Sequence, residues 1–145
     1  MRVYLDTCSL QRPLDSKTQI RIILEAESVL GILALCERGQ LGLVASDALM
    51  FEVERNPNLA RQEYALEVLA QASTFVELDE QVEKRARELH QQGIKPLDAL
   101  HLACAESARA DYFCTCDDEL LRKARRLQDL QIQVTSPLEL IAEVE

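Results

Sequence analysis

The chain has 145 residues and a formal net charge of −9, from 25 acidic and 16 basic residues. This length favours a single domain, residues 1–145, that can bury a core without disulfide bonds. The acidic balance argues against a protein with a broad basic face for nucleic acid, but not against an enzyme whose acids hold a metal ion facing phosphate. We expect no signal peptide and no membrane span, and therefore a cytoplasmic protein.

Short apolar runs alternate with amphipathic ones along the chain. The first half predicts strands at residues 2–5, 41–46 and 74–78, and helices at residues 16–40, 47–57 and 59–73. Ser46 or Asp47 can cap the helix that begins at residue 47, which Asn56-Pro57 ends. Gly39 has the position of a glycine that ends a helix.

The second half continues the alternation. It predicts helices at residues 80–93, 95–105, 117–127 and 136–145, and strands at residues 111–115 and 132–135. Asp79 precedes the first of these helices, and Ser136 with Glu139 forms a capping box at the last. Strands that alternate with helices predict a mostly parallel sheet covered on both faces, which binds ligands outside the carboxyl ends of its strands.

The cysteines are expected to be reduced thiols inside the fold. They are odd in number, include no C-x-x-C pair, and the two histidines do not complete a zinc site. They stand at positions 8, 36, 104, 114 and 116.

Acidic residues stand near these strand ends in four separate segments. They are Asp6, the helix acids Glu52 and Glu54, Asp98, and the pair Asp117 and Asp118. Carboxylates that converge repel one another unless a cation neutralises them, and a set of oxygen ligands suits Mg²⁺ or Mn²⁺. Each helix acid also has a purely structural interpretation, as an N-cap, a dipole partner or a solvated side chain. The residues alone predict an acidic metal pocket.

Four segments together resemble the PIN domain family. They are VYLDTCSL, SDALMFEVERNP, KPLDALHLACA and YFCTCDDELLRKA, and their order and spacing match along nearly the whole chain. The resemblance implies a Rossmann-like, three-layer α/β/α sandwich and a metal-dependent endoribonuclease. Many small bacterial and archaeal members are VapC-type toxins of toxin–antitoxin pairs. Residues 11–27, QRPLDSKTQIRIILEAE, depart from the commonest short toxins.

The resemblance also implies the site residues. The catalytic acids by position are Asp6, Glu52, Asp98 and Asp117, with Asp118 and Glu54 as alternatives. Asp6, Asp98 and Asp117 are expected to be ligands of Mg²⁺ or Mn²⁺, and Glu52 to ligate or to orient the water. Ser9 and Thr115 match hydroxyl positions near the site, whereas His101 is interpreted as a packing residue.

The substrate is expected to be RNA. Basic residues near the motifs are the candidates to grip it: Arg12, Lys17, Arg21 and Arg55. One alternative is a degenerate PIN module that binds RNA or protein without cutting. An aspartyl phosphoryl-transfer enzyme would need an acid where Cys8 stands, and a receiver domain would need a lysine after the last strand.

Two helical segments, residues 27–40 and 59–73, are more apolar than one core-facing stripe requires. The side chains concerned are Leu30, Ile32, Leu33, Leu35, Leu66, Val68 and Leu69. This excess predicts a homodimer. In a toxin-like system, an antitoxin peptide would lie across the acidic pocket and offer an arginine to the carboxylates.

Overall fold

A computed structural model, which describes all 145 residues, has a five-stranded sheet in the order β3-β2-β1-β4-β5. Every strand pairs in parallel with its neighbour. The strands are β1 (Arg2–Leu5), β2 (Gly42–Ser46), β3 (Thr74–Val76), β4 (Tyr112–Cys114) and β5 (Gln133–Thr135). The strand order reverses between β1 and β4, and such a point is where open α/β sheets bind ligands.

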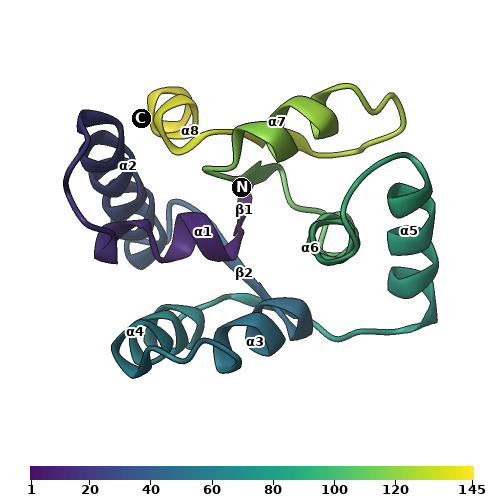
Figure 1. Ribbon diagram of the computed structural model, residues 1–145, viewed down its shortest axis with the longest axis horizontal. Coiled ribbons are helices and arrows are strands. Elements are labelled where there is room, and N and C mark those ends of the chain that lie inside the picture. Colours follow the sequence, from purple (N-terminus) through teal and green to yellow (C-terminus); the bar gives the residue numbers. More distant parts are fainter.

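Helices cover both faces of this sheet, with α2 and α8 on one side and α5 and α6 on the other (Figure 1). The helices are α1 (Thr7–Leu10), α2 (Ile20–Glu37), α3 (Asp47–Glu54), α4 (Leu59–Leu69), α5 (Glu80–Gln91), α6 (Pro96–Ser107), α7 (Asp118–Arg125) and α8 (Pro137–Val144), and the 3-10 helix is η1 (Arg12–Leu14). The predicted α/β/α sandwich is confirmed, and its sheet is parallel throughout. None of the helices combines the length and the apolarity that crossing a membrane requires.

The predicted helix ends are confirmed where a specific residue type marks them. Ser46 caps α3 by accepting a hydrogen bond from the Leu49 amide at 3.1 Å, and Asp79 caps α5. The capping box at α8 is present. Gly39 and Gly93 have positive φ angles, +78° and +103°, where a side chain would be strained.

The structure differs from the prediction between β1 and α2. The helix predicted from residue 16 begins at Ile20. Residues 7–10 form α1 and residues 12–14 form η1, neither of which the sequence predicted. Both elements are too short to show a helical period, and the Asp6 side chain supplies the cap that holds α1.

The core is centred on β1, whose residues Val3, Tyr4 and Leu5 are fully buried. The Tyr4 ring stacks on Phe113 of β4 with centroids 5.3 Å apart. Immediately after β1, the Asp6 amide donates to the Cys114 carbonyl at 3.2 Å. The carboxyl ends of β1 and β4 are thereby joined at one edge, where the chain presents its first and last candidate acids.

Candidate active site

Asp6 is buried at the end of β1. Its Oδ1 accepts hydrogen bonds from the Ser9 amide at 3.1 Å and the Cys8 thiol at 3.1 Å. Burial raises the pKa of Asp6, and the adjacent Cys8 raises it further, while hydrogen bonding from Thr115 and Ser9 offsets part of the effect. No cation of the protein forms an ion pair with Asp6.

Glu52 of α3 is held in place by two donors. Its Oε1 accepts hydrogen bonds from the Thr7 hydroxyl and from Nε2 of His101, the latter at 2.8 Å. Burial raises the pKa of Glu52, but the hydrogen bonds from His101 and Thr7 outweigh it and the net pKa is lowered. Glu52 is therefore an ionised carboxylate with one oxygen fixed and the other without a donor.

His101 is buried and connects Glu52 to a chain of hydroxyls inside the protein. Its Nδ1 lies 2.6 Å from the Tyr4 hydroxyl, which lies 2.7 Å from the Ser46 hydroxyl. Every group is satisfied if Ser46 donates to Tyr4, Tyr4 donates to Nδ1, and Nε2–H donates to Glu52. His101 is buried, as the sequence interpretation expected, but it also contacts a candidate acid. Its spacing of three from Asp98 puts both on one helix face, but the contact with Glu52, 49 residues away, could not be predicted from the sequence.

Asp98 stands in the first turn of α6 but does not cap it. The N-cap is Lys95, which makes no side-chain cap, and Pro96 follows. The half-buried Asp98 carboxylate accepts no hydrogen bond and forms no ion pair within the protein. Burial raises its pKa, and the charges of Asp117 and Glu52 raise it further, although His101 and Lys95 act in the opposite direction. Asp98 is therefore an unpaired acid close to two others.

Asp117 is the N-cap of α7, as its sequence position allowed. Its Oδ1 accepts from the amides of Glu119 at 2.9 Å and Leu120 at 3.2 Å. Its own amide donates to the Thr115 hydroxyl at 3.0 Å. The second oxygen of Asp117 accepts no hydrogen bond, and Asp117 lines a small pocket together with Asp98. One carboxylate can thus cap the helix and face the pocket.

The other predicted site residues form contacts with further parts of the chain. Asp118 forms an ion pair with Arg21 at 2.7 Å. Glu54 is exposed, two positions after Glu52, so the two side chains point to different sides of α3. Ser9 is buried, and its hydroxyl donates to the Cys114 carbonyl at 3.2 Å, which ties α1 to β4. All five cysteines are free thiols; Cys104, Cys114 and Cys116 are buried inside the fold, whereas Cys36 is half-buried and Cys8 is exposed.

The four basic residues proposed to grip RNA all have partners within the protein. Arg12 and Arg21 contact Glu25, and Lys17 donates to backbone carbonyl groups. The Arg55 guanidinium lies 4.1 Å from the centre of the exposed Phe51 ring. Lys95, which sequence reasoning did not single out, is exposed, forms no ion pair and lines the pocket of Asp98.

The donor set fits a hard divalent ion. The acids that converge supply only oxygen, and Asp98 and Asp117 each have an oxygen without a donor. No three His, Cys, Asp or Glu side chains are close enough to form a ready-made cage. Mg²⁺ is commonly held by one or two carboxylates and keeps several waters, so this arrangement suits it.

Comparison with known structures supports the fold. A chain of VapBC2 from Rickettsia felis bound to a DNA fragment from their promoter has a TM-score of 0.62 at 14% identity, covering 94% of this chain and 98% of that one. PAE2754 from Pyrobaculum aerophilum has a TM-score of 0.57 at 16% identity, and the match covers 99% of this chain and 89% of that one. A chain of VapBC-1 from nontypeable Haemophilus influenzae has a TM-score of 0.54 at 20% identity, and the match covers 94% of this chain and 98% of that one.

No curated protein sequence matches the chain. The PIN domain family model matches residues 3–126. This match contains all four candidate acids, and PIN domains are generally nucleases that use divalent metals. The chain belongs to the PIN domain family.

Proposed function

We propose that this protein is a metal-dependent endoribonuclease that hydrolyses phosphodiester bonds in single-stranded RNA. The observation that carries the proposal is the state of Asp98, a half-buried carboxylate without a partner, near the charges of Asp117 and Glu52. A protein retains uncompensated acids in one place at a cost in stability, which a bound cation removes. Asp6, Asp98 and Asp117 would hold Mg²⁺ or Mn²⁺, directly or through the waters that the ion keeps.

Glu52 is the candidate to position the attacking water. Thr7 and His101 fix its Oε1 and leave the other oxygen free to accept a hydrogen bond from that water. When bound, the metal ion lowers the pKa of a coordinated water and stabilises the charge that develops on the phosphate. Because Thr7 and the buried His101 already orient the Glu52 carboxylate, it needs no rearrangement when the water arrives.

The test is cleavage of single-stranded RNA with Mg²⁺ or Mn²⁺ and with EDTA. We expect EDTA to abolish cleavage and Asp98→Asn to lower it by about 100-fold, because several kcal/mol of charge stabilisation depend on the ion. Glu88→Gln, at an exposed position of α5, is the matched control and should cut like wild type. Undiminished cleavage in EDTA would refute the proposal, and metal binding without any cleavage would favour the degenerate binding module.

A protein partner of the antitoxin kind is part of the proposal. Its support is the resemblance to VapC-type toxins, together with the fold shared with chains of two VapBC structures. The product of a neighbouring gene should then inhibit RNA cleavage when mixed with this protein in equimolar amounts. A neighbouring product that leaves cleavage unchanged would argue against such a pair.

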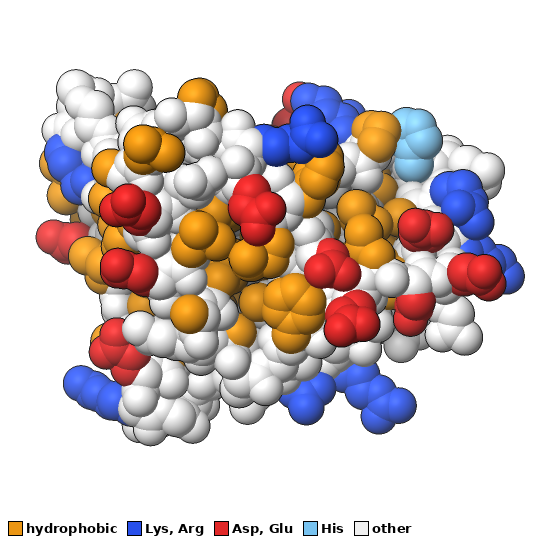
Figure 2. Space-filling view, turned by 90° about the horizontal axis from the view of Figure 1, so that it is seen from below, with side chains coloured by type: hydrophobic (Ala, Val, Ile, Leu, Met, Phe, Trp, Pro, Cys, Tyr) orange, Lys and Arg blue, Asp and Glu red, His pale blue; other side chains and the backbone are white.

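We also propose a homodimer formed through α2 and α4. A groove of about 590 Å³ lies between these helices, lined by Leu30, Leu33, Tyr64 and Val68 among others. Ile32 and Leu69 are buried in the core, whereas Leu30 is half-exposed. Figure 2, which views the molecule from the side of α3 and α4, shows apolar side chains gathered among acidic ones. A second copy would cover the groove.

A further inference from the structure

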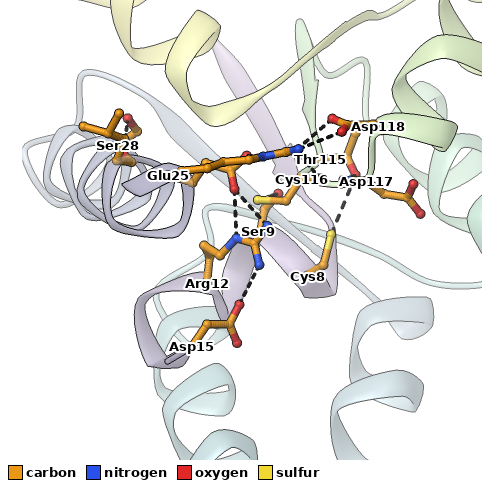
Figure 3. A network of polar contacts seen from close by, with 12 residues as sticks. Cys8, Ser9, Arg12, Asp15, Glu25, Ser28, Thr115, Cys116, Asp117 and Asp118 are labelled. Carbon is orange, nitrogen blue, oxygen red and sulfur yellow. Dashed lines mark hydrogen bonds and ion pairs between the residues drawn. The ribbon is translucent and has the colours of Figure 1, made fainter. Parts of the chain in front are cut away.

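A buried carboxylate, Glu25 of α2, organises the charged residues beside the loop that carries Asp117 (Figure 3). Only 2% of its side chain is exposed. It forms an ion pair with Nη2 of Arg12 at 2.8 Å, and it accepts hydrogen bonds from Nε of Arg12 at 3.1 Å and from Nε of Arg21 at 3.3 Å. Buried charges persist when they are paired in this way, and the pairing fixes the direction of both guanidinium groups.

The network continues into the segment before α2. Arg12 also contacts Asp15 at 2.9 Å, and Asp15 contacts Arg61 of α4 at 2.8 Å. These residues belong largely to the stretch 11–27 that departs from the commonest short toxins. Residues 11–27 therefore supply most of the charged side chains of a network that lies beside α7.

The guanidinium group of Arg21 contacts the residues on both sides of Asp117. Its Nη1 and Nη2 each contact one carboxylate oxygen of Asp118 at 2.7 Å. Nη2 also donates to the carbonyl of Cys116 at 3.1 Å. Since the Asp117 amide is bound to Thr115, residues 115 to 118 are fixed at every step, and Asp117 has little freedom to turn.

We propose that Arg21 is a positioning residue for the metal site, which it serves by holding Cys116 and Asp118 so that the free oxygen of Asp117 stays directed at the pocket of Asp98. This inference rests on the proposed metal-dependent function. It also gives Arg21 and Asp118 one shared task, in place of separate tasks as an RNA contact and an alternative ligand. The guanidinium group matters here, because the single nitrogen of a lysine cannot replace the three nitrogens that reach both oxygens of Asp118, the Cys116 carbonyl and Glu25.

The effect should appear in metal binding rather than in overall stability. Arg21 and Asp118 are 47% and 68% exposed, and exposed ion pairs contribute little to stability. Simple electrostatics predicts the opposite sign, since removing the positive charge of Arg21 would make the acidic pocket attract a cation more strongly. Weaker metal binding after loss of Arg21 therefore indicates a positioning role, whereas tighter binding indicates only an effect of its charge.

The experiment is calorimetric titration of the metal-free protein with Mn²⁺, which needs no RNA and no turnover. We expect Arg21→Met and Arg21→Lys to weaken Mn²⁺ binding by about 10–100-fold, as loss of an outer partner of a metal site does. Asp118→Asn should weaken it too, and the double variant Arg21→Met with Asp118→Asn should be no weaker than Arg21→Met alone.

The matched control is Arg125→Met, at the other end of α7. Arg125 is 45% exposed, contacts Glu139 at 3.0 Å and donates to the Val134 carbonyl at 3.1 Å. Like Arg21, it thus contacts one carboxylate and one backbone carbonyl, but it does so away from the site. It should bind Mn²⁺ like wild type. Equal or tighter binding by Arg21→Met would overturn the inference and leave the proposed function standing. Wild-type protein that binds no Mn²⁺ would overturn both.

Discussion

His101 and Glu52 are 49 residues apart in the chain, yet Nε2 of His101 lies 2.8 Å from the Glu52 carboxylate. The pair joins α6 to α3, and the other side of the imidazole contacts Tyr4 of β1. A candidate catalytic acid is thus oriented from the core of the protein. Its direction depends on a side chain that solvent does not reach.

Substitutions of His101 should therefore separate its two hydrogen bonds. Glutamine places its amide nitrogen near the position of Nε2, so His101→Gln should keep the donor to Glu52 and cleave within a few-fold of wild type. Asparagine is shorter and can reach only Tyr4, so His101→Asn should lower kcat by about 10–100-fold. Single-turnover cleavage measures the difference.

Both His101 variants should lose about 1–3 kcal/mol of stability, because each leaves a buried polar group without its partner. Denaturant unfolding of both variants is the control, since it shows whether activity simply follows stability. Equal cleavage by the two variants at equal stability would mean that the contact with Glu52 has no role in activity.

Asp98→Asn should raise the melting temperature of the metal-free protein at pH 7. The pKa of Asp98 is raised, so the folded protein binds this proton more tightly than the unfolded chain does, and the stability contributed by Asp98 falls as pH rises through that pKa. The variant removes this cost, which solvent screening keeps small at a half-buried side chain, so the melting temperature should rise by a few degrees. The gain should shrink as pH falls towards the ordinary aspartate pKa of about 3.9. Calorimetric scans across this pH range give the result.

The same pair of proteins tests whether the metal uses Asp98. Adding Mg²⁺ should stabilise wild type by mass action and stabilise Asp98→Asn less. Identical Mg²⁺ shifts for the two proteins would show that Asp98 is only an acid near a helix end.

Lys95→Ala should weaken RNA binding more than it slows the chemical step. Lys95 is exposed and unpaired beside Asp98, where it can contact a phosphate next to the one that is cut. KM should rise several-fold with kcat nearly unchanged, and the salt dependence of binding should fall by about one phosphate contact. Lys84→Ala, in the second turn of α5, is the control. A fall in kcat alone would place Lys95 in another role.

Leu30→Glu should convert the proposed dimer into a monomer, because a charge in the groove between α2 and α4 cannot be covered by a second copy without loss of hydration. Light scattering should give twice 16.4 kDa for wild type and 16.4 kDa for the variant. Leu59→Glu, at an exposed apolar position of α4 outside the groove, should stay dimeric. A wild-type mass of one chain at high concentration would remove the dimer.

The sequence predicted the fold well because its local patterns are strong and agree with one another. Strand runs such as RVYL are apolar and short, and caps such as Asp79 and Ser136 mark helix starts through their own chemistry. The short helices α1 and η1 escaped prediction because fewer than five residues cannot display a period. Helix ends without a distinctive residue, such as the start of α2 at Ile20, were placed several residues too far out.

Of the candidate site, the sequence allowed only the acidic residues to be predicted, and not the side chains that contact them. Each acid follows a motif that can be read locally, but its partners come from distant segments. Arg21 and Asp118 are 97 residues apart, and no local pattern indicates that they meet. For the same reason, Arg21 resembled a free cation in the sequence, although the structure surrounds it with Glu25 and Asp118.

The place of β1 in the sheet has a consequence for synthesis. Within this sheet β1 is synthesised before the other strands, but its neighbour β4 ends at Cys114, and the hydrogen bond from the Asp6 amide to the Cys114 carbonyl cannot form before that residue is made. At about 5–20 residues per second, this interval lasts roughly 5–20 s. During that time Asp6 and Asp117 belong to unconnected parts of the chain and no pocket exists. A protein proposed to cut RNA is thereby kept inert until the segment that carries Asp117 has been made.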